Sequence, residues 1–163
     1  MGRAVEIAIE GGRFDHVAHA ATTIRELLPL YAGQLGGRPL YGGENERVGY
    51  RGMMLGFGDG SQIELLEPLP GSTFLDRFFA RNPAGGLHHV TFRVDDLRRA
   101  VERARAAGLE IVGEYLDDPD WLEAFVHPRA AHGTVVQLLE TAPDRPAKMP
   151  GVTFDDLLGP VVA

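Results

Sequence analysis

The sequence predicts an α+β fold made of two tandem βαβββ modules, because parts of the chain repeat at a constant offset. FDHVAHA (14–20) aligns with LHHVTFR (87–93), and IELLE (63–67) aligns with VQLLE (136–140); 87 − 14 and 136 − 63 both give 73. The helix-like segments 23–34 and 96–107 keep the same offset. A fixed period in three separated segments is typical of a duplicated unit.

Each module is expected to begin with a β-branched strand, followed by a helix and three further strands. Residues of the types that open and end helices flank both helical segments: Thr22 or Thr23 and Asp95 or Asp96 at the start, and Gly36-Gly37 and Gly108 at the end. The Asp59-Gly60 pair predicts a hairpin turn. The expected later strands are 38–42, 50–58 and 61–68 in one module, and 109–116, 122–128 and 133–140 in the other.

These modules are predicted to form one domain over residues 1–163, with module one at 13–69, a linker at 70–86, module two at 87–141 and a tail at 142–163. A unit of this size buries only a limited core alone, so the two modules are expected to share one and to face each other across a cleft. The linker contains an amphipathic piece that favours a short helix. PGVTFDDLLGP (150–160) in the tail could form a docked helix, a lid or a dimer contact.

Composition excludes several classes of function. The net charge of −7 argues against a nucleic-acid partner. No apolar run approaches the roughly 20 residues of a membrane span, so no membrane partner is expected. The chain has no cysteine, which excludes disulfides and thiolate metal sites, and a cytoplasmic location is the default. The densest basic run is interpreted as a solvated helix face, although it could serve an anionic cofactor tail: Arg98, Arg99, Arg103 and Arg105, with Glu102 among them.

The repeat also predicts a metal site. His16 is equivalent to His89, and Glu64 to Gln137; 64 − 16 and 137 − 89 both give 48. Glu64 lies in an apolar run, where a carboxylate costs several kcal/mol unless it is paired or binds a cation. Two imidazoles, one carboxylate and one amide oxygen suit Co²⁺, Mn²⁺, Ni²⁺, Zn²⁺ or Fe²⁺ better than Ca²⁺.

Each of these four residues also has a simpler interpretation. A single histidine in a strand is more often a satisfied structural residue than a ligand, and a strand glutamate usually lies on a solvated face. Their shared register in a duplicated unit favours the metal site.

Four segments resemble the vicinal oxygen chelate superfamily, which includes glyoxalase I, extradiol dioxygenases, bleomycin-resistance proteins and methylmalonyl-CoA epimerases. The resemblance covers about residues 13–141, and the sequences of these segments are most similar to those of the epimerases. The four segments are FDHVAHAA, IELLEPL, GGLHHVTFRVDDL and HPRAAHGTVVQLLE. It implies paired βαβββ modules that form a metal-containing cleft, with ligands at His16, Glu64, His89 and Gln137. It also implies a homodimer, since dimers are frequent in such families.

The resemblance implies a metal-dependent epimerase-like isomerase that stabilises an enolate by chelating vicinal oxygens of a small-molecule substrate, such as an acyl-CoA thioester. In ENERVGY (44–50), the position of a loop carboxylate falls on Glu46, with Glu44 as the alternative and Glu64 as a second catalytic group. One departure is Gln137, where epimerases usually have a glutamate implicated in proton transfer; an amide cannot act as a base. Glu64 stands where some epimerases have glutamine. The two residues have exchanged, or the chain catalyses other chemistry.

Two alternative functions stay open. One is a glyoxalase-type lyase that acts on a small carbonyl substrate with the same four ligands. The other is a metal-free protein that binds and sequesters small molecules. A dioxygenase fits less well, because extradiol enzymes use two histidines and one glutamate, and here the last position is Gln137.

Overall fold

The computed structural model describes residues 12–143 and 148–159, which divide into two compact units. We call residues 16–88 with 148–159 the His16 unit, and residues 12–15 with 89–143 the His89 unit, after the histidine that each contains. The linker residues 70–86 belong to the His16 unit. The single domain over 1–163 stays a prediction, and its residues 1–11, 144–147 and 160–163 lie outside the described ranges.

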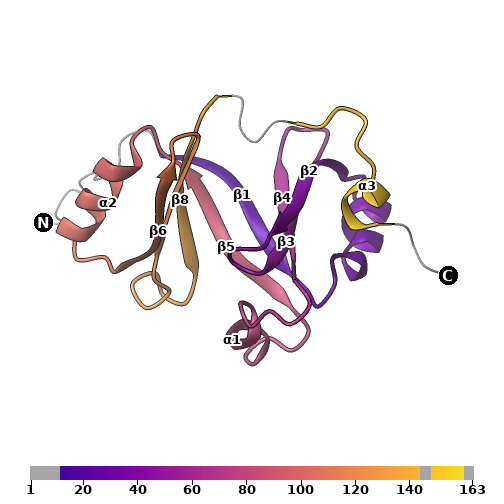
Figure 1. The fold of residues 1–163 in the computed structure, drawn as a ribbon, viewed down its shortest axis with the longest axis horizontal. Helices are drawn as coiled ribbons and strands as arrows, with labels where there is room; N and C mark the ends of the chain where they lie inside the picture. Colours follow the sequence, from indigo (N-terminus) through magenta and orange to yellow (C-terminus); the bar gives the residue numbers. More distant parts are fainter. Residues whose placement is uncertain (1–11, 144–147, 160–163) are drawn as a thin grey trace, which may run out of the picture. The chain divides into compact units, whose positions relative to one another are not determined.

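The strands follow the predicted βαβββ order twice (Figure 1). The sheet order is β2-β3-β4-β1-β5-β8-β7-β6, so each run of four has its first strand beside its last. The α+β class and the repeated module are therefore confirmed. The strands are β1 (Arg13–Ala20), β2 (Arg38–Asn45), β3 (Tyr50–Gly56), β4 (Gln62–Pro68), β5 (Gly86–Arg93), β6 (Ile111–Asp118), β7 (Trp121–Val126) and β8 (Val135–Thr141).

The duplication extends to individual hydrogen bonds. β1 pairs in parallel with β4 and β5 with β8, whereas β2, β3 and β4 and then β6, β7 and β8 pair antiparallel. The amide of Ala21 donates to the carbonyl of Leu66 (3.0 Å), and the amide of Val94 donates to that of Leu139 (2.9 Å). Both bonds keep the offset of 73 that the sequence shows.

The helical segments differ between the units. In the His89 unit, α2 (Leu97–Ala106) confirms the expected helix, and the side chain of Asp96 caps it by accepting from the amide of Arg99 (2.9 Å). In the His16 unit, the prediction of one helix over 23–34 was wrong, because the segment contains a 3-10 turn, η1 (Ile24–Glu26), and a π-helix, η2 (Pro29–Gln34). Pro29 lacks a backbone N–H, so it fits the first turn of a new helix better than the interior of a continuous one.

Each unit has its own apolar core on one face of its strands. In the His89 unit, α2 packs on β7 and β8; the buried cluster is Val94, Leu97, Ala100, Val101, Leu122, Ala124 and Leu138. In the His16 unit, η1 and η2 pack on β3 and β4; the buried cluster is Ile24, Met53, Leu55, Ile63 and Leu65. The opposite face of each set of strands is not covered by these helices, and we call it the open face.

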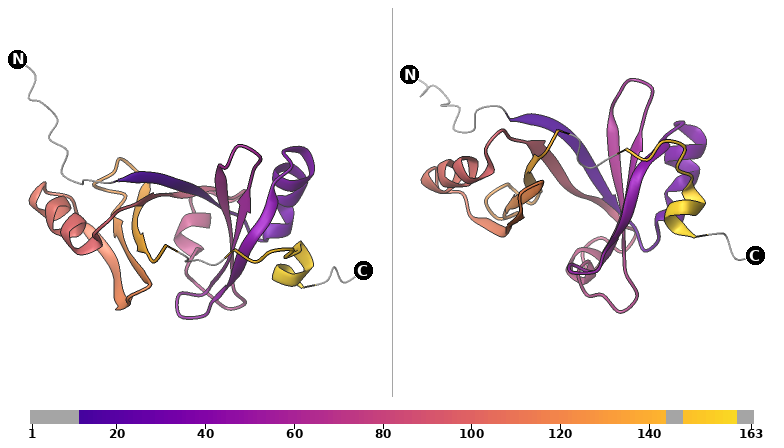
Figure 2. Two further views of the ribbon diagram at one scale, coloured as in Figure 1. Left: turned by 90° about the horizontal axis from the view of Figure 1, so that it is seen from above. Right: turned by 45° about the horizontal axis from the view of Figure 1, so that its top comes forward.

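Two short helices complete the His16 unit. The linker contains α1 (Asp76–Phe79), as its amphipathic pattern predicts. In the tail, α3 (Phe154–Leu158) packs through its apolar side chains against the core of this unit, and it lies beside η2 in both views of Figure 2. The guanidinium of Arg25 donates to the carbonyls of Leu158 and Gly159. The short helix of the tail is therefore docked on the His16 unit.

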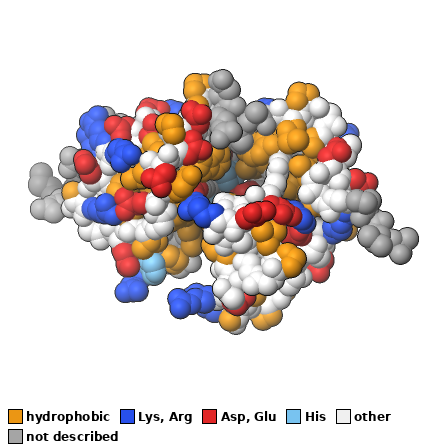
Figure 3. Space-filling model, in the orientation of Figure 1, with side chains coloured by type: hydrophobic (Ala, Val, Ile, Leu, Met, Phe, Trp, Pro, Cys, Tyr) orange, Lys and Arg blue, Asp and Glu red, His pale blue; other side chains and the backbone are white. Residues whose placement is uncertain are grey.

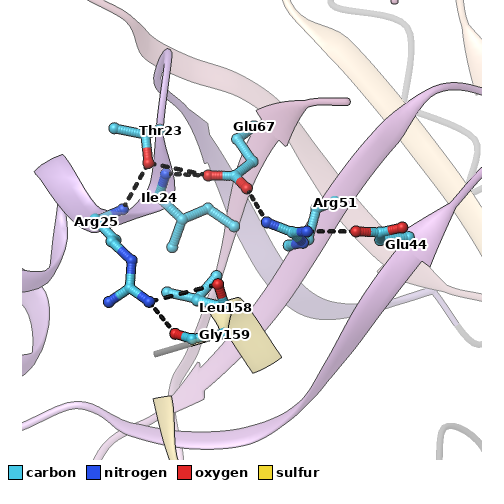
Figure 4. Close-up of polar contacts among 8 residues, drawn as sticks. All are labelled: Thr23, Ile24, Arg25, Glu44, Arg51, Glu67, Leu158 and Gly159. Carbon is cyan, nitrogen blue, oxygen red and sulfur yellow. Dashed lines mark hydrogen bonds and ion pairs between the residues drawn. The ribbon is translucent and has the colours of Figure 1, made fainter. Parts of the chain in front are cut away.

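Two equivalent glutamates fix where the helical segments begin. Glu67 accepts from the amide of Ile24 (2.7 Å), and Glu140 accepts from the amide of Leu97 (2.7 Å). Both carboxylates satisfy a first-turn N–H that has no partner within its helix. Glu67 also pairs with Arg51 (2.5 Å), as Figure 4 shows.

Charged side chains of both signs are interspersed over the α2 side of the molecule (Figure 3). Arg98, Arg99 and Arg105 are exposed, and Arg105 pairs with Glu114. The basic run is therefore a solvated helix face, as expected. Within the described ranges, the helices are too short or too polar to cross a bilayer.

Candidate functional site

His16 and Glu64 form a close pair on the open face of the His16 unit. The register of β1 with β4 pairs Ala18 with Glu64, so His16 and Glu64 lie diagonally on neighbouring strands. His16 is buried, with 4% of its surface exposed, and its Nε2 lies 3.6 Å from Glu64 Oε2. Alternation along β1 explains this placement, because Val17 and His19 face the helices instead.

A glycine makes room for the Glu64 carboxylate. Met54 pairs with Glu64 across β3 and β4, and Gly52 is the next residue on the same face. A Cβ at Gly52 would lie 2.9 Å from Glu64 Oε1, closer than real Cβ atoms approach a neighbour. The carboxylate therefore keeps its position only because residue 52 has no side chain.

His88 lies between apolar rings and the charge of Glu64. Its ring contacts those of Phe74 and Phe78, with centroids 6.0 and 5.1 Å away. Burial lowers the pKa of His88 below its ordinary value, while the negative charge of Glu64 acts in the opposite direction. The neutral ring is thus favoured beside the carboxylate.

His89 and Gln137 lie on the open face of the His89 unit. His89 is 8% exposed and packs edge-to-face on Phe125, whereas Gln137 is 6% exposed. The register of β5 with β8 pairs Thr91 with Gln137, and Thr91 Oγ1 donates to Gln137 Oε1 (2.7 Å).

The predicted ligands are divided equally between the two units. His16 and Glu64 lie together in the His16 unit, and His89 and Gln137 lie at the equivalent positions of the His89 unit. Two imidazoles and a carboxylate are a donor set that divalent Fe, Zn, Co, Ni and Mn accept, and burial of the histidines limits competition from water. The residues present therefore fit a divalent cation.

The predicted loop carboxylates occupy different environments. Glu46 is exposed in the turn that joins β2 and β3. Glu44 pairs with Arg51, and Arg51 also pairs with Glu67 on the helix-covered face (Figure 4). The register of β2 and β3 places Glu44 opposite Arg51, so Glu44 faces away from the side that carries Glu64.

Glu123 is a buried carboxylate that the sequence interpretation missed. It lies on β7 with 9% of its surface exposed, and its Oε2 accepts from Gln137 Nε2 (2.8 Å) and Trp121 Nε1 (3.2 Å). Alternation in WLEAF (121–125) places Glu123 on the same face as Trp121 and Phe125, which could have identified it once β7 was registered against β8.

A cavity of about 350 Å³ in the His16 unit lies beyond the ends of β3 and β4. Arg38 and Lys148 line it together with several glycines, but it includes none of the predicted ligands. We do not assign it to the site.

Comparison with known families agrees with this fold. Residues 15–125 match the model of the Glyoxalase/Bleomycin resistance protein/Dioxygenase superfamily. The chain belongs to this superfamily. The sequence resemblance to the vicinal oxygen chelate fold is therefore confirmed.

Within this superfamily, the chain is similar to methylmalonyl-CoA epimerases. It is 29% identical over 135 residues to the mitochondrial methylmalonyl-CoA epimerase of Dictyostelium discoideum, covering 79% of this chain and 78% of that protein. The methylmalonyl-CoA epimerase structure from Mycobacterium tuberculosis matches with a TM-score of 0.72 and 26% identity, over 87% of this chain and 95% of that one. A Streptomyces coelicolor methylmalonyl-CoA epimerase variant in complex with 2-nitronate-propionyl-CoA matches with a TM-score of 0.67 and 27% identity, over 80% and 97%.

Proposed function

We propose that this chain is a divalent-metal-dependent epimerase that moves the α-proton of an acyl-CoA thioester of the methylmalonyl type. The observation that carries the proposal is the pair of His16 and Glu64, whose Nε2 and Oε2 atoms lie 3.6 Å apart, with a second buried histidine, His89, at the equivalent position of the other unit. The names of the similar proteins support the substrate class, since they are epimerases of methylmalonyl-CoA and one is bound to a propionyl-CoA analogue.

His16, Glu64 and His89 would hold the cation, with the amide oxygen of Gln137 as a fourth ligand. Co²⁺, Mn²⁺, Ni²⁺, Zn²⁺ and Fe²⁺ all suit these donors. When bound, such an ion supplies Lewis-acid stabilisation of an enolate by chelating two oxygens of the substrate. The buried imidazoles orient the site and exclude water from it.

Epimerisation needs one group to remove the α-proton and another to return a proton to the opposite face. We assign the first role to the carboxylate of Glu46, which is exposed and two residues beyond Glu44 in the turn after β2. The ion pair of Glu44 with Arg51 on the helix-covered face supports Glu46 over Glu44. Glu64 is the second acid–base group, because Gln137 has no titratable proton. A homodimer and a cytoplasmic location complete the proposal.

The deciding experiment follows the α-proton of methylmalonyl-CoA in D₂O by mass spectrometry, with protein reconstituted with Co²⁺ or Mn²⁺. We expect the chain to incorporate deuterium far faster than metal alone. E46Q should slow incorporation roughly 10²–10⁴-fold, the usual contribution of an acid–base group, whereas E44Q serves as the matched carboxylate control and should have a much smaller effect.

Three outcomes would contradict the proposal. Exchange no faster than with metal alone would exclude the epimerase. Turnover of a glutathione hemithioacetal, with none of the thioester, would favour the glyoxalase-type lyase. A chain that holds no metal after purification without chelator, and none after reloading, would favour the small-molecule binding protein.

A further inference from the structure

The open face of the His89 unit carries a line of polar side chains across three strands. Thr91 on β5, Gln137 on β8, and Glu123 and Trp121 on β7 are joined in that order by hydrogen bonds of 2.7, 2.8 and 3.2 Å. The central strand is β8, so the Gln137 side chain lies between the other two strands. Three of its four members are buried, with Thr91 0%, Gln137 6% and Glu123 9% exposed.

The chemistry of these side chains fixes which group donates and which accepts in each hydrogen bond of the line. An indole N–H can only donate, and that of Trp121 donates to Glu123 Oε2, so this carboxyl oxygen is an acceptor. Because Glu123 Oε2 must accept, the neighbouring Gln137 has to present its NH₂ group to β7. The reverse orientation would place the amide oxygen against a carboxylate oxygen in a buried site, which is strongly unfavourable.

The orientation of the amide decides which atom of the Gln137 side chain faces β5. With the nitrogen held toward β7, Oε1 points toward β5, where Thr91 Oγ1 donates to it. His89 precedes Thr91 by two residues and shares its face of β5. A carbonyl oxygen has two lone pairs, so Oε1 can accept from Thr91 and still coordinate a cation.

We propose that Glu123 is a positioning residue that fixes the Gln137 amide with its oxygen on the His89 side. Gln137 lacks the charge that would attract a cation by itself, and an unconstrained amide presents its NH₂ group as readily as its oxygen. The carboxylate on β7 removes that ambiguity. Groups behind a ligand commonly fix its orientation in this way. The link to a cation rests on the proposed function, whereas the orientation itself does not.

Substitutions at residue 123 separate orientation from packing. In E123Q, the indole of Trp121 still donates to a side-chain oxygen, so that oxygen can also accept from Gln137 and the direction is kept. In E123M, the volume is similar but no strong acceptor remains, and the Gln137 amide loses its direction. In T91V, the Glu123 bond persists, so the direction is kept.

The first readout uses protein without metal. The side-chain ¹⁵N–¹H₂ resonances of Gln137 report on its hydrogen bonds, and the signal is assigned by its loss in Q137L. We expect one well-dispersed pair in the unaltered chain, in E123Q and in T91V, and averaged or doubled signals in E123M. An unchanged pair in E123M would overturn the proposal.

The second readout is Co²⁺ affinity, followed by the visible absorption of the bound ion. Losing a group that orients a ligand typically weakens metal binding roughly 10–100-fold, which we expect for E123M. E123Q and T91V should remain within about threefold of the unaltered chain, because their amide direction is kept. Equal affinities in E123M and the unaltered chain would overturn the proposal, since a merely structural role changes thermal stability and not the Co²⁺ spectrum.

A milder variant covers the case in which E123M does not fold. E123Q/W121F removes the donor that fixes the direction of the new amide at 123, so we expect mixed Gln137 signals and weaker Co²⁺ binding than in E123Q. Identical signals and affinities in the two would overturn the proposal. A chain with an oriented Gln137 amide that binds no Co²⁺ would contradict the metal site of the proposed function but leave the orientation by Glu123 supported.

Discussion

The His16 unit and the His89 unit share their backbone pairing and differ in the side chains of their open faces. Glu67 and Glu140 accept from equivalent amides at the same distance of 2.7 Å, and both parallel strand pairs keep the offset of 73. On the open face, by contrast, Ala18 is equivalent to Thr91 and Glu64 to Gln137.

This difference separates two groups of residues. One group is needed to form the module in either unit, and the other gives each open face its own polar side chains. A first-turn N–H must be satisfied in any copy of the module, so both copies retain a glutamate for it. The open face has no such requirement and its polar groups differ. In the His16 unit the carboxylate of Glu64 lies beside the histidine, whereas in the His89 unit the carboxylate of Glu123 lies one strand further away, behind an amide.

The largest expected effect comes from exchanging the two equivalent side chains, Glu64 and Gln137. E64Q removes the carboxylate that lies 3.6 Å from His16, so we expect Co²⁺ affinity and the rate of α-proton exchange each to fall roughly 10²–10³-fold. Q137E in the same chain should restore only part of both, because it places a new carboxylate 2.8 Å from Glu123, where two like charges disfavour each other.

Removing the charge of Glu123 should then complete the exchange. E64Q/Q137E/E123Q keeps one carboxylate on the open face of the His89 unit and should bind Co²⁺ more tightly than E64Q/Q137E. Isothermal titration with Co²⁺ measures all of these variants, and E102Q on the exposed face of α2 serves as a charge-matched control. If E64Q bound Co²⁺ as well as the unaltered chain, the two faces would not differ in the way described above.

The repeat made the fold predictable from the sequence. The features that could not be predicted depend on specific local contacts. Offset and alternation placed His16, Glu64, His89 and Gln137, because a duplicated register depends only on spacing. The break at Pro29 was overlooked, since helical periodicity alone does not show where a helix restarts. Glu123 could not be found by the repeat: its equivalent position is Tyr50, and its role depends on the pairing of β7 with β8.

An intermediate effect is expected from the two glutamates that the units share. Glu67 accepts from the amide of Ile24 and also pairs with Arg51, whereas Glu140 accepts from the amide of Leu97. Hydrogen bonds to charged groups are worth roughly 1.5–3 kcal/mol, so E67Q should lower the free energy of unfolding by about 2–3 kcal/mol and E140Q by about 1–2 kcal/mol. Urea denaturation monitored by far-UV circular dichroism measures both.

Equal losses in E67Q and E140Q would mean that the ion pair of Glu67 with Arg51 adds nothing to the His16 unit. The ion pair of Glu44 with the same Arg51 provides a check (Figure 4). E44Q should cost less than E67Q, because the Glu44 side chain is 43% exposed and the Glu67 side chain 11%.

The smallest effect concerns a pH dependence that one unit has and the other lacks at the same position. His19 on β1 faces the helices and its Nδ1 lies 2.8 Å from the hydroxyl of Tyr31, whereas the equivalent residue on β5 is Phe92. Burial lowers the pKa of His19 below its ordinary value of 6.5. The unfolded chain therefore takes up a proton at higher pH than the folded protein, so this contribution to stability is present above about pH 6.5 and is lost as the pH falls toward the folded pKa.

Replacing His19 by the residue that the other unit uses isolates this contribution. H19F should be less stable than the unaltered chain at pH 7.5, because Tyr31 loses its partner, but it should lose less of its stability than the unaltered chain between pH 7.5 and 5.5. Y31F keeps the histidine and should retain the pH dependence. Urea denaturation at the two pH values measures the difference. Equal losses in H19F and the unaltered chain would show that the folded and unfolded states bind the His19 proton equally. The helix-covered faces of β1 and β5 would then not differ in their dependence on pH.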